Sequence, residues 1–269
     1  MAGQKRLIIR PGAIGDCILS LPAMEWMRGS YLEIWAPSQV LSLVTFADRT
    51  RSIAASGLEM LAFGPRPGLV EELRQFDGIV SWYGANQPEF RALVADLGLP
   101  FEFLAPLPPK DSTVHAADFF LKQVGGAPPA IPRIHVPSQR PREFAMLHPF
   151  AGSAAKRWPL ERFRELARIL ERGMRVEWCA GPEDSLDGAV RIDNLYELAR
   201  HLAAARVFVG NDSGITHLAA AVETPVVALF GPADPRVWAP RGPRVAVVAK
   251  PEVDQITMQE VLEAVQRVG

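Results

Sequence analysis

The stretch VGNDSGITHLAAAVETPVVALFGPADP, residues 209–235, decides the fold. An apolar strand pattern ends in a glycine-containing turn, a helical pattern follows over 213–222, and a continuously apolar run occupies 225–230. Continuous apolar runs are typical of strands that are buried on both faces, and a strand–helix–strand succession predicts parallel strand pairing. The stretch therefore predicts a right-handed βαβ unit of an α/β protein.

The same alternation extends over the rest of the 269 residues. Helices are predicted at 14–28, 160–172, 195–204, 213–222 and 257–268. Strands are predicted at 6–10, 31–36, 77–83, 101–104, 144–148, 174–180, 189–192, 206–210, 225–230 and 244–248. Pro22 should kink or delay the first helix, because proline has no backbone N–H. This succession predicts an α/β protein with doubly wound parallel sheets.

A stretch rich in proline and glycine, GGAPPAIPRIHVPSQRP at 125–141, separates two halves of similar size. Such a composition does not form a regular helix or strand, so we interpret it as a linker. The predicted domains are 1–135 and 136–269. The last helix carries the apolar stripe of Val261, Leu262, Val265 and Val268, so we expect it to dock on its own domain or back on the first one.

Composition excludes several classes of protein. The 29 Lys+Arg and 30 Asp+Glu give a net charge of −1, which lacks the basic bias of a nucleic-acid binder. Two distant cysteines, Cys17 and Cys179, exclude a disulfide framework and a zinc–cysteine site. No signal-peptide pattern and no apolar run of about 20 residues is present, so a cytoplasmic location is expected.

The first candidate loop, RPGAIGD at 10–16, directly follows the first predicted strand. Gly12 and Gly15 let the backbone approach a ligand, and the following helix offers free N–H groups. The loop lacks the third glycine of a dinucleotide fingerprint, and the chain has no phosphate-binding GK[ST] loop. Asp16 has two interpretations, a capping acid in the first helical turn or a general base.

The second candidate loop, HPFAGSAAKRWP at 148–159, opens the second half. Gly152 and Ser153 can present backbone amides and a hydroxyl, and Lys156 is a point charge suited to a phosphate oxygen. The alternative interpretation is a solvated basic loop.

The third candidate loop contains Asp212, Ser213 and Gly214 and leads into a helix with His217 in its first turn. The amides of Ser213 and Gly214 could bind a diphosphate at this helix start. Alternatively, Asp212 and Ser213 cap the helix and His217 is a structural histidine. A fourth loop, at 230–235, is better interpreted as a rigid turn.

Three of these stretches resemble glycosyltransferase family 9, the lipopolysaccharide heptosyltransferases. They are LIIRPGAIGDCILSLPAM (7–24), HPFAGSAAKRWPLERF (148–163) and the stretch at 209–235. The resemblance is good for the first 25 residues and for 141–269, and poor between about 28 and 140. It implies a GT-B architecture, in which two Rossmann-like doubly wound domains face each other across a cleft. The first domain would take the acceptor and the second the nucleotide-sugar donor.

The resemblance also implies an inverting reaction without a metal or another cofactor. The catalytic residues would be Asp16, as base, and Lys156, which binds the donor phosphates. The acceptor-side loop would contain Gly12, Ala13 and Gly15. The donor and its nucleotide would be held by Gly152, Ser153, Glu183, Asp212, Ser213, Gly214 and His217, with Glu183 at the ribose.

The expected partners are ADP-heptose as donor and a hydroxyl of a lipopolysaccharide-core or related glycan, or a glycolipid, as acceptor. Such an acceptor implies peripheral contact with the cytoplasmic face of the inner membrane. The first half is shorter than is usual in the family, which implies a reduced acceptor site.

Three other functions stay open at this point. A nucleotide-sugar epimerase of the same architecture would need no acceptor. A non-catalytic relative would hold a nucleotide sugar without transferring it. A nicotinamide oxidoreductase is disfavoured by the incomplete glycine fingerprint.

Overall fold

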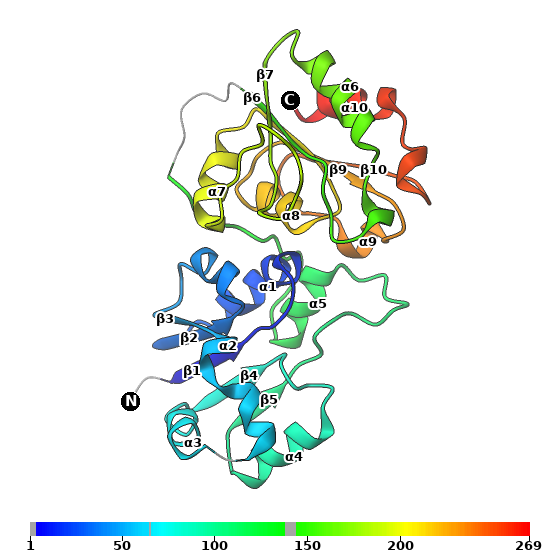
Figure 1. The fold of residues 1–269 in the computed structure, drawn as a ribbon. Coiled ribbons are helices and arrows are strands. Elements are labelled where there is room, and N and C mark those ends of the chain that lie inside the picture. The colour runs from blue at the N-terminus through cyan, green and yellow to red at the C-terminus, as the bar shows by residue number, and fades with distance from the viewer. Residues whose placement is uncertain (1–3, 65, 138–143) are drawn as a thin grey trace. The chain divides into compact units, whose positions relative to one another are not determined.

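The structure is a computed structural model that describes residues 4–64, 66–137 and 144–269, and the chain divides into two units (Figure 1). Unit 1 consists of Met1–Ser112 and Ala116–Ala130, and unit 2 of Thr113–His115 and Ile131–Gly269. Each unit holds a five-stranded sheet in which every strand pair is parallel. The predicted α/β class is therefore confirmed, whereas the boundary at 135/136 stays a prediction.

The sheet of unit 1 has the strand order β3-β2-β1-β4-β5. Its strands are β1 (Lys5–Ile9), β2 (Tyr31–Ala36), β3 (Arg49–Ser52), β4 (Gly78–Ser81) and β5 (Phe101–Phe103). Its helices are α1 (Ile14–Trp26), η1 (Ser38–Leu43), α2 (Ile53–Ser56), η2 (Leu58–Phe63), α3 (Pro67–Leu73), α4 (Pro88–Asp96) and α5 (Ala116–Gln123). One face of the sheet, with Leu7, Ile9 and Ile79, is covered by buried side chains of α2, η2, α3 and α4. Helices α1 and α5 pack against each other.

The sheet of unit 2 has the strand order β10-β9-β8-β6-β7. Its strands are β6 (Phe144–His148), β7 (Arg175–Trp178), β8 (Val207–Asn211), β9 (Val226–Phe230) and β10 (Val245–Ala249). Its helices are η3 (Ala154–Lys156), α6 (Leu160–Leu170), α7 (Leu195–Ala203), α8 (Gly214–Ala221), α9 (Pro235–Trp238), η4 (Val253–Gln255) and α10 (Met258–Val268).

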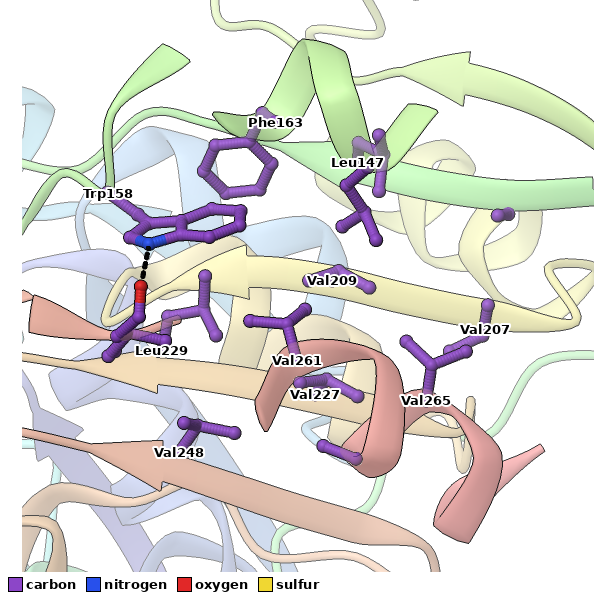
Figure 2. Packing of buried hydrophobic residues seen from close by; sticks show 14 of the residues in the cluster. Leu147, Trp158, Phe163, Val207, Val209, Val227, Leu229, Val248, Val261 and Val265 are labelled. Atoms are coloured by element: carbon purple, nitrogen blue, oxygen red, sulfur yellow. Dashed lines mark hydrogen bonds between the residues drawn. The ribbon is translucent and has the colours of Figure 1, made fainter. Parts of the chain in front are cut away.

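Helices α6 and α10 pack on the same face of this sheet (Figure 2). Alternate residues of β8 and β9 point to that face, including Val209 and Leu229. Trp158 packs edge-to-face on Phe163 at a centroid distance of 5.1 Å, and its Nε1 donates a hydrogen bond to the Ile256 carbonyl at 2.9 Å. Of the two docking surfaces open to it, the last helix therefore lies on the sheet of its own unit.

Two expectations from the sequence need correction. The segment 189–192 forms only an isolated bridge between Val190 and Cys179, and no strand. Helix α1 runs through Pro22 without interruption. Residues 127–137 contain no helix or strand, as their composition predicts, and Ile134 is buried with its N–H donating to the Ala221 carbonyl at 2.9 Å. The remainder of the predicted linker, 138–141, lies outside the described residues.

Candidate functional site

Four loops of unit 2 lie side by side at one edge of its sheet. They follow β7, β6, β8 and β9, which are consecutive in the strand order. Parallel strands end at the same edge, so the loops that contain Glu183, Lys156 and Asp212 come from neighbouring strand ends. This edge is where open α/β sheets bind ligands.

Lys156 and Asp212 form the central ion pair of this edge. The Lys156 Nζ lies 2.6 Å from the Asp212 Oδ2, and the two side chains are 35% and 7% exposed. No hydrogen bond reaches this Oδ2 from the described residues, so the ion pair with Lys156 is what offsets the cost of burying the carboxylate charge. The structure thus joins two predicted site residues that are far apart in the chain, and it leaves about a third of the Lys156 side chain exposed.

The start of α8 lies directly after Asp212. Ser213 caps this helix, with its Oγ accepting a hydrogen bond from the Thr216 N–H at 3.4 Å. Gly214 occupies the first helical position, where backbone N–H groups have no partner within the helix. The capping interpretation of Ser213 is therefore correct, and it is compatible with anion binding, because a capped helix start still has free amides.

His217 is buried in the first turn of α8. Burial, together with the nearby His115 and Lys156, lowers its pKa to about 3, so the imidazole is neutral at physiological pH. His115 lies 2.8 Å from the Ala239 carbonyl through its Nε2, which must carry the proton because a carbonyl only accepts. His217 therefore contributes no positive charge to this end of the helix.

The Lys156 loop, residues 149–158, is held internally by Arg157. Its guanidinium donates two hydrogen bonds to the Ala151 carbonyl at 2.9 and 2.7 Å. Gly152 and Ser153 are exposed at the top of the loop, and an added Cβ at Gly152 would meet nothing within 4 Å. Both can be reached by a ligand, as the phosphate-binding interpretation requires.

The loop after β7 carries Glu183 in an exposed position. Asp184 and Arg191 brace this loop, with the Asp184 Oδ2 accepting from the Gly181 N–H at 2.8 Å. No contact between Glu183 and the other predicted donor residues is found within the described part of the chain. In the loop after β9, Asp234 caps α9 and pairs with Arg236 at 2.7 Å, as a rigid turn requires.

In unit 1, Asp16 lies in the first turn of α1, after the carboxyl end of β1. Its Oδ2 accepts a hydrogen bond from the Ala13 N–H at 3.2 Å, while its Oδ1 has no hydrogen-bond partner among the described residues. Gly12 has a φ of +125°, and a Cβ there would lie 3.2 Å from the Asp16 Cβ, so a side chain would be strained and crowded. Asp16 therefore caps the helix with one oxygen and keeps the other available for a proton. Gly15 lies within this first turn, directly before Asp16.

Arg10 lies beneath this loop and was not selected from the sequence. It is 1% exposed, and its guanidinium donates to the Pro11 and Asp16 carbonyls, both at 3.1 Å, and to the Ser20 Oγ at 3.0 Å. The charge also lies over the rings of Trp82 and Phe120, at 5.2 and 4.7 Å from their centroids. Burial lowers the pKa of Arg10, whereas the charge of Asp16 raises it.

The described residues contain neither a membrane-spanning helix nor a cluster of metal-binding side chains. No helix is long and apolar enough to cross a membrane. No group of three or more His, Cys, Asp or Glu side chains is arranged to hold a metal ion. Neither finding tests the predicted lack of a metal requirement, which stays a prediction.

Comparison with known proteins defines the class of this two-sheet α/β protein. The sequence profile of Glycosyltransferase family 9 (heptosyltransferase) matches residues 127–265, which is more than half of the chain. The chain therefore belongs to this family.

The curated relatives match shorter segments. Lipopolysaccharide heptosyltransferase 1 of Pseudomonas aeruginosa is 40% identical over 93 residues, covering 30% of this chain and 26% of the relative. Lipopolysaccharide heptosyltransferase 1 of Escherichia coli K12 is 32% identical over 123 residues, covering 40% of this chain and 39% of the relative. The matches thus span well under half the length of these relatives.

Solved structures extend the fold comparison over nearly the whole chain. The Escherichia coli ADP-heptose lps heptosyltransferase II has a TM-score of 0.77 at 19% identity, with 98% of both chains covered. The Escherichia coli heptosyltransferase WaaC with ADP has a TM-score of 0.73 at 21% identity, with 99% of this chain and 100% of that chain covered. At these identities the likeness shows the shared fold.

Proposed function

We propose that this chain is an inverting, metal-independent glycosyltransferase that moves a sugar from a nucleotide-diphosphate sugar to a glycan hydroxyl. The observation that carries the proposal is the Lys156–Asp212 pair beside the start of α8, within the segment that matches the family. A partly exposed lysine side chain and free helix amides form a site suited to a diphosphate. Family membership favours glycosyl transfer as the use of such a site.

The proposed donor is ADP-heptose. Solved structures of the Escherichia coli heptosyltransferase WaaC contain ADP and ADP-2-deoxy-2-fluoro heptose, which supports an adenine nucleotide and a heptose for this chain. In the proposed reaction the bond between the anomeric carbon and the diphosphate oxygen breaks, and ADP leaves with that electron pair. Lys156 and the α8 amides would stabilise the charge that develops on the leaving diphosphate, in place of a metal ion.

Asp16 is the proposed base. The acceptor hydroxyl oxygen attacks the anomeric carbon from the face opposite the nucleotide, and its proton passes to the Asp16 Oδ1, so the configuration inverts. A carboxylate is a much weaker base than an alkoxide, so the proton transfer belongs in the transition state, where the hydroxyl has become acidic.

The proposed acceptor is a lipopolysaccharide-core or related glycan. A glycolipid acceptor of this kind would bring the enzyme to the cytoplasmic face of the inner membrane, and we place the reaction there.

The test compares the Asp16→Asn variant with wild-type protein in donor binding and in transfer. An asparagine oxygen can still accept the Ala13 N–H, so the helix cap is kept while the base is lost. Turnover should fall about 10²–10⁴-fold, with ADP affinity unchanged. Asp77→Asn is the matched control, because Asp77 accepts the Lys5 N–H at 2.6 Å at the opposite end of β1.

Several outcomes would contradict this function. Equal turnover in the Asp16→Asn variant removes Asp16 as the base, and loss of transfer on treatment with a chelator removes the metal-independent mechanism. Release of an epimerised sugar without acceptor indicates an epimerase. Donor binding without any transfer indicates a binding protein.

A further inference from the structure

Asn211 is a fully buried polar residue at the end of β8, in the middle of the second sheet. Its Oδ1 accepts a hydrogen bond from the Trp158 N–H at 3.0 Å, and its Nδ2 donates to the Pro149 carbonyl at 2.9 Å. Pro149 and Trp158 are the two ends of the Lys156 loop. One side chain therefore holds both ends of this loop on the neighbouring strand.

The strand register explains why a side chain is needed at this position. The pairing of β6 with β8 ends with His148 opposite Gly210, so the next pair would be Pro149 and Asn211. Proline has no N–H and cannot continue a ladder in the usual way. The amide of Asn211 extends the connection between the strands beyond the last backbone pair.

The backbone of Asn211 is tied to the other half of the site. Its carbonyl accepts a hydrogen bond from the Thr216 Oγ1 in the first turn of α8. The next residue, Asp212, pairs with Lys156. Asn211 thus connects the loop that carries the lysine with the helix start beside it.

We propose that Asn211 is the positioning residue of the nucleotide-diphosphate site, because it orders the Lys156 loop and sets the Lys156 ammonium against the start of α8. The ligand part of this inference rests on the proposed function. Arg157 braces only the interior of the loop through the Ala151 carbonyl, so it cannot replace the attachment of the loop ends to β8.

The test is Asn211→Ala in the full chain, with Thr224→Ala as the matched control. Thr224 is also buried in unit 2, and its hydroxyl donates to the Leu202 carbonyl at 2.8 Å, next to the opposite end of the sheet. The control removes a buried side-chain-to-backbone hydrogen bond without touching the Lys156 loop.

Two measurements are made on both variants. Hydrogen exchange of the amides at 150–158 should accelerate at least about tenfold in Asn211→Ala, because both loop ends lose their hydrogen bonds to β8. The Kd for ADP should rise about 10–100-fold, because the Lys156 ammonium is no longer held against the start of α8 and its charge-assisted hydrogen bond to the diphosphate is lost. Both quantities should stay within about twofold of wild type in Thr224→Ala.

The inference is overturned if Asn211→Ala changes the hydrogen-exchange rates of the Lys156 loop and the Kd for ADP no more than Thr224→Ala does. If the wild-type protein does not bind ADP, the proposed function fails, and the exchange measurement alone then decides whether Asn211 orders the loop. Should Asn211→Ala not fold, Asn211→Ser carries the same expectation, because one hydroxyl cannot hold both loop ends.

Discussion

Replacing Lys156 by methionine should lower the free energy of unfolding by about 2 kcal/mol. Unit charges about 4 Å apart attract by about 4 kcal/mol at an effective dielectric constant of 20. Breaking a fully buried pair costs about 3–5 kcal/mol, and breaking an exposed one about 0–1 kcal/mol. The pair lies between these limits, because Asp212 is 7% exposed and Lys156 is 35% exposed. The loss comes from the buried carboxylate that is left without its partner.

The measurement is urea-induced unfolding of the full chain in a double-mutant cycle of Lys156→Met and Asp212→Asn. Without the carboxylate, loss of the lysine should cost much less, so a coupling free energy of about 1–2 kcal/mol is expected. Lys250→Met is the matched control. Lys250 pairs with Glu260 at 2.7 Å, but both side chains are about one-third exposed, so its loss should cost less than about 1 kcal/mol.

The same variants have a ligand-binding consequence. Lys156→Met should weaken ADP binding about 10–100-fold, which corresponds to one charge-assisted hydrogen bond. Two results would refute the reasoning about the buried carboxylate. In the first, the effects of the two substitutions on the free energy of unfolding add to within about 0.5 kcal/mol. In the second, Lys156→Met lowers this free energy no more than Lys250→Met does.

Two further predictions concern buried basic groups. Burial holds the pKa of His217 at about 3 in the folded chain, against 6.5 when unfolded, so the unfolded state binds more protons below pH 6.5 and stability falls as the pH falls. Between pH 7 and pH 5, the free energy of unfolding of His217→Gln should therefore fall by about 2 kcal/mol less than that of the wild type, as measured by urea titrations. The same dependence of the unfolding free energy on pH in both proteins would contradict this. Arg10→Met should lower turnover about 10²-fold with little effect on ADP affinity, because the Pro11 and Asp16 carbonyls lose their donor. Steady-state kinetics with a parallel ADP titration checks this, and unchanged turnover would show that Arg10 only fills the core.

The predicted strands show what sequence patterning can detect. Continuous apolar runs such as 225–230 mark the central strands, because both faces of these strands are buried. The strand β3 was missed because its residues, Arg49–Ser52, form an edge strand without an apolar alternation. Helix α4 was missed because its buried side is narrow, with only Phe90 and Val94 buried over nine residues.

The site was predictable only in part. Glycines and polar residues after strands are a local signal, and they led to Asp16, Lys156 and Asp212. The pairing of Lys156 with Asp212 joins residues that are far apart in the chain, so no local pattern predicts it. Asn211 lay inside the quoted motif, yet its partners are 53 and 62 residues away.

The two residues that hold the functional loops show why the attachment is polar. The residues of a loop that present backbone groups and charges to a ligand must stay accessible, so burial of those residues cannot anchor the loop. Arg10 binds two carbonyls of the Asp16 loop, and Asn211 binds both ends of the Lys156 loop. Each unit therefore keeps its loop in place through one buried polar side chain at the carboxyl end of a central strand. Loss of either side chain should therefore disorder the loop that it holds.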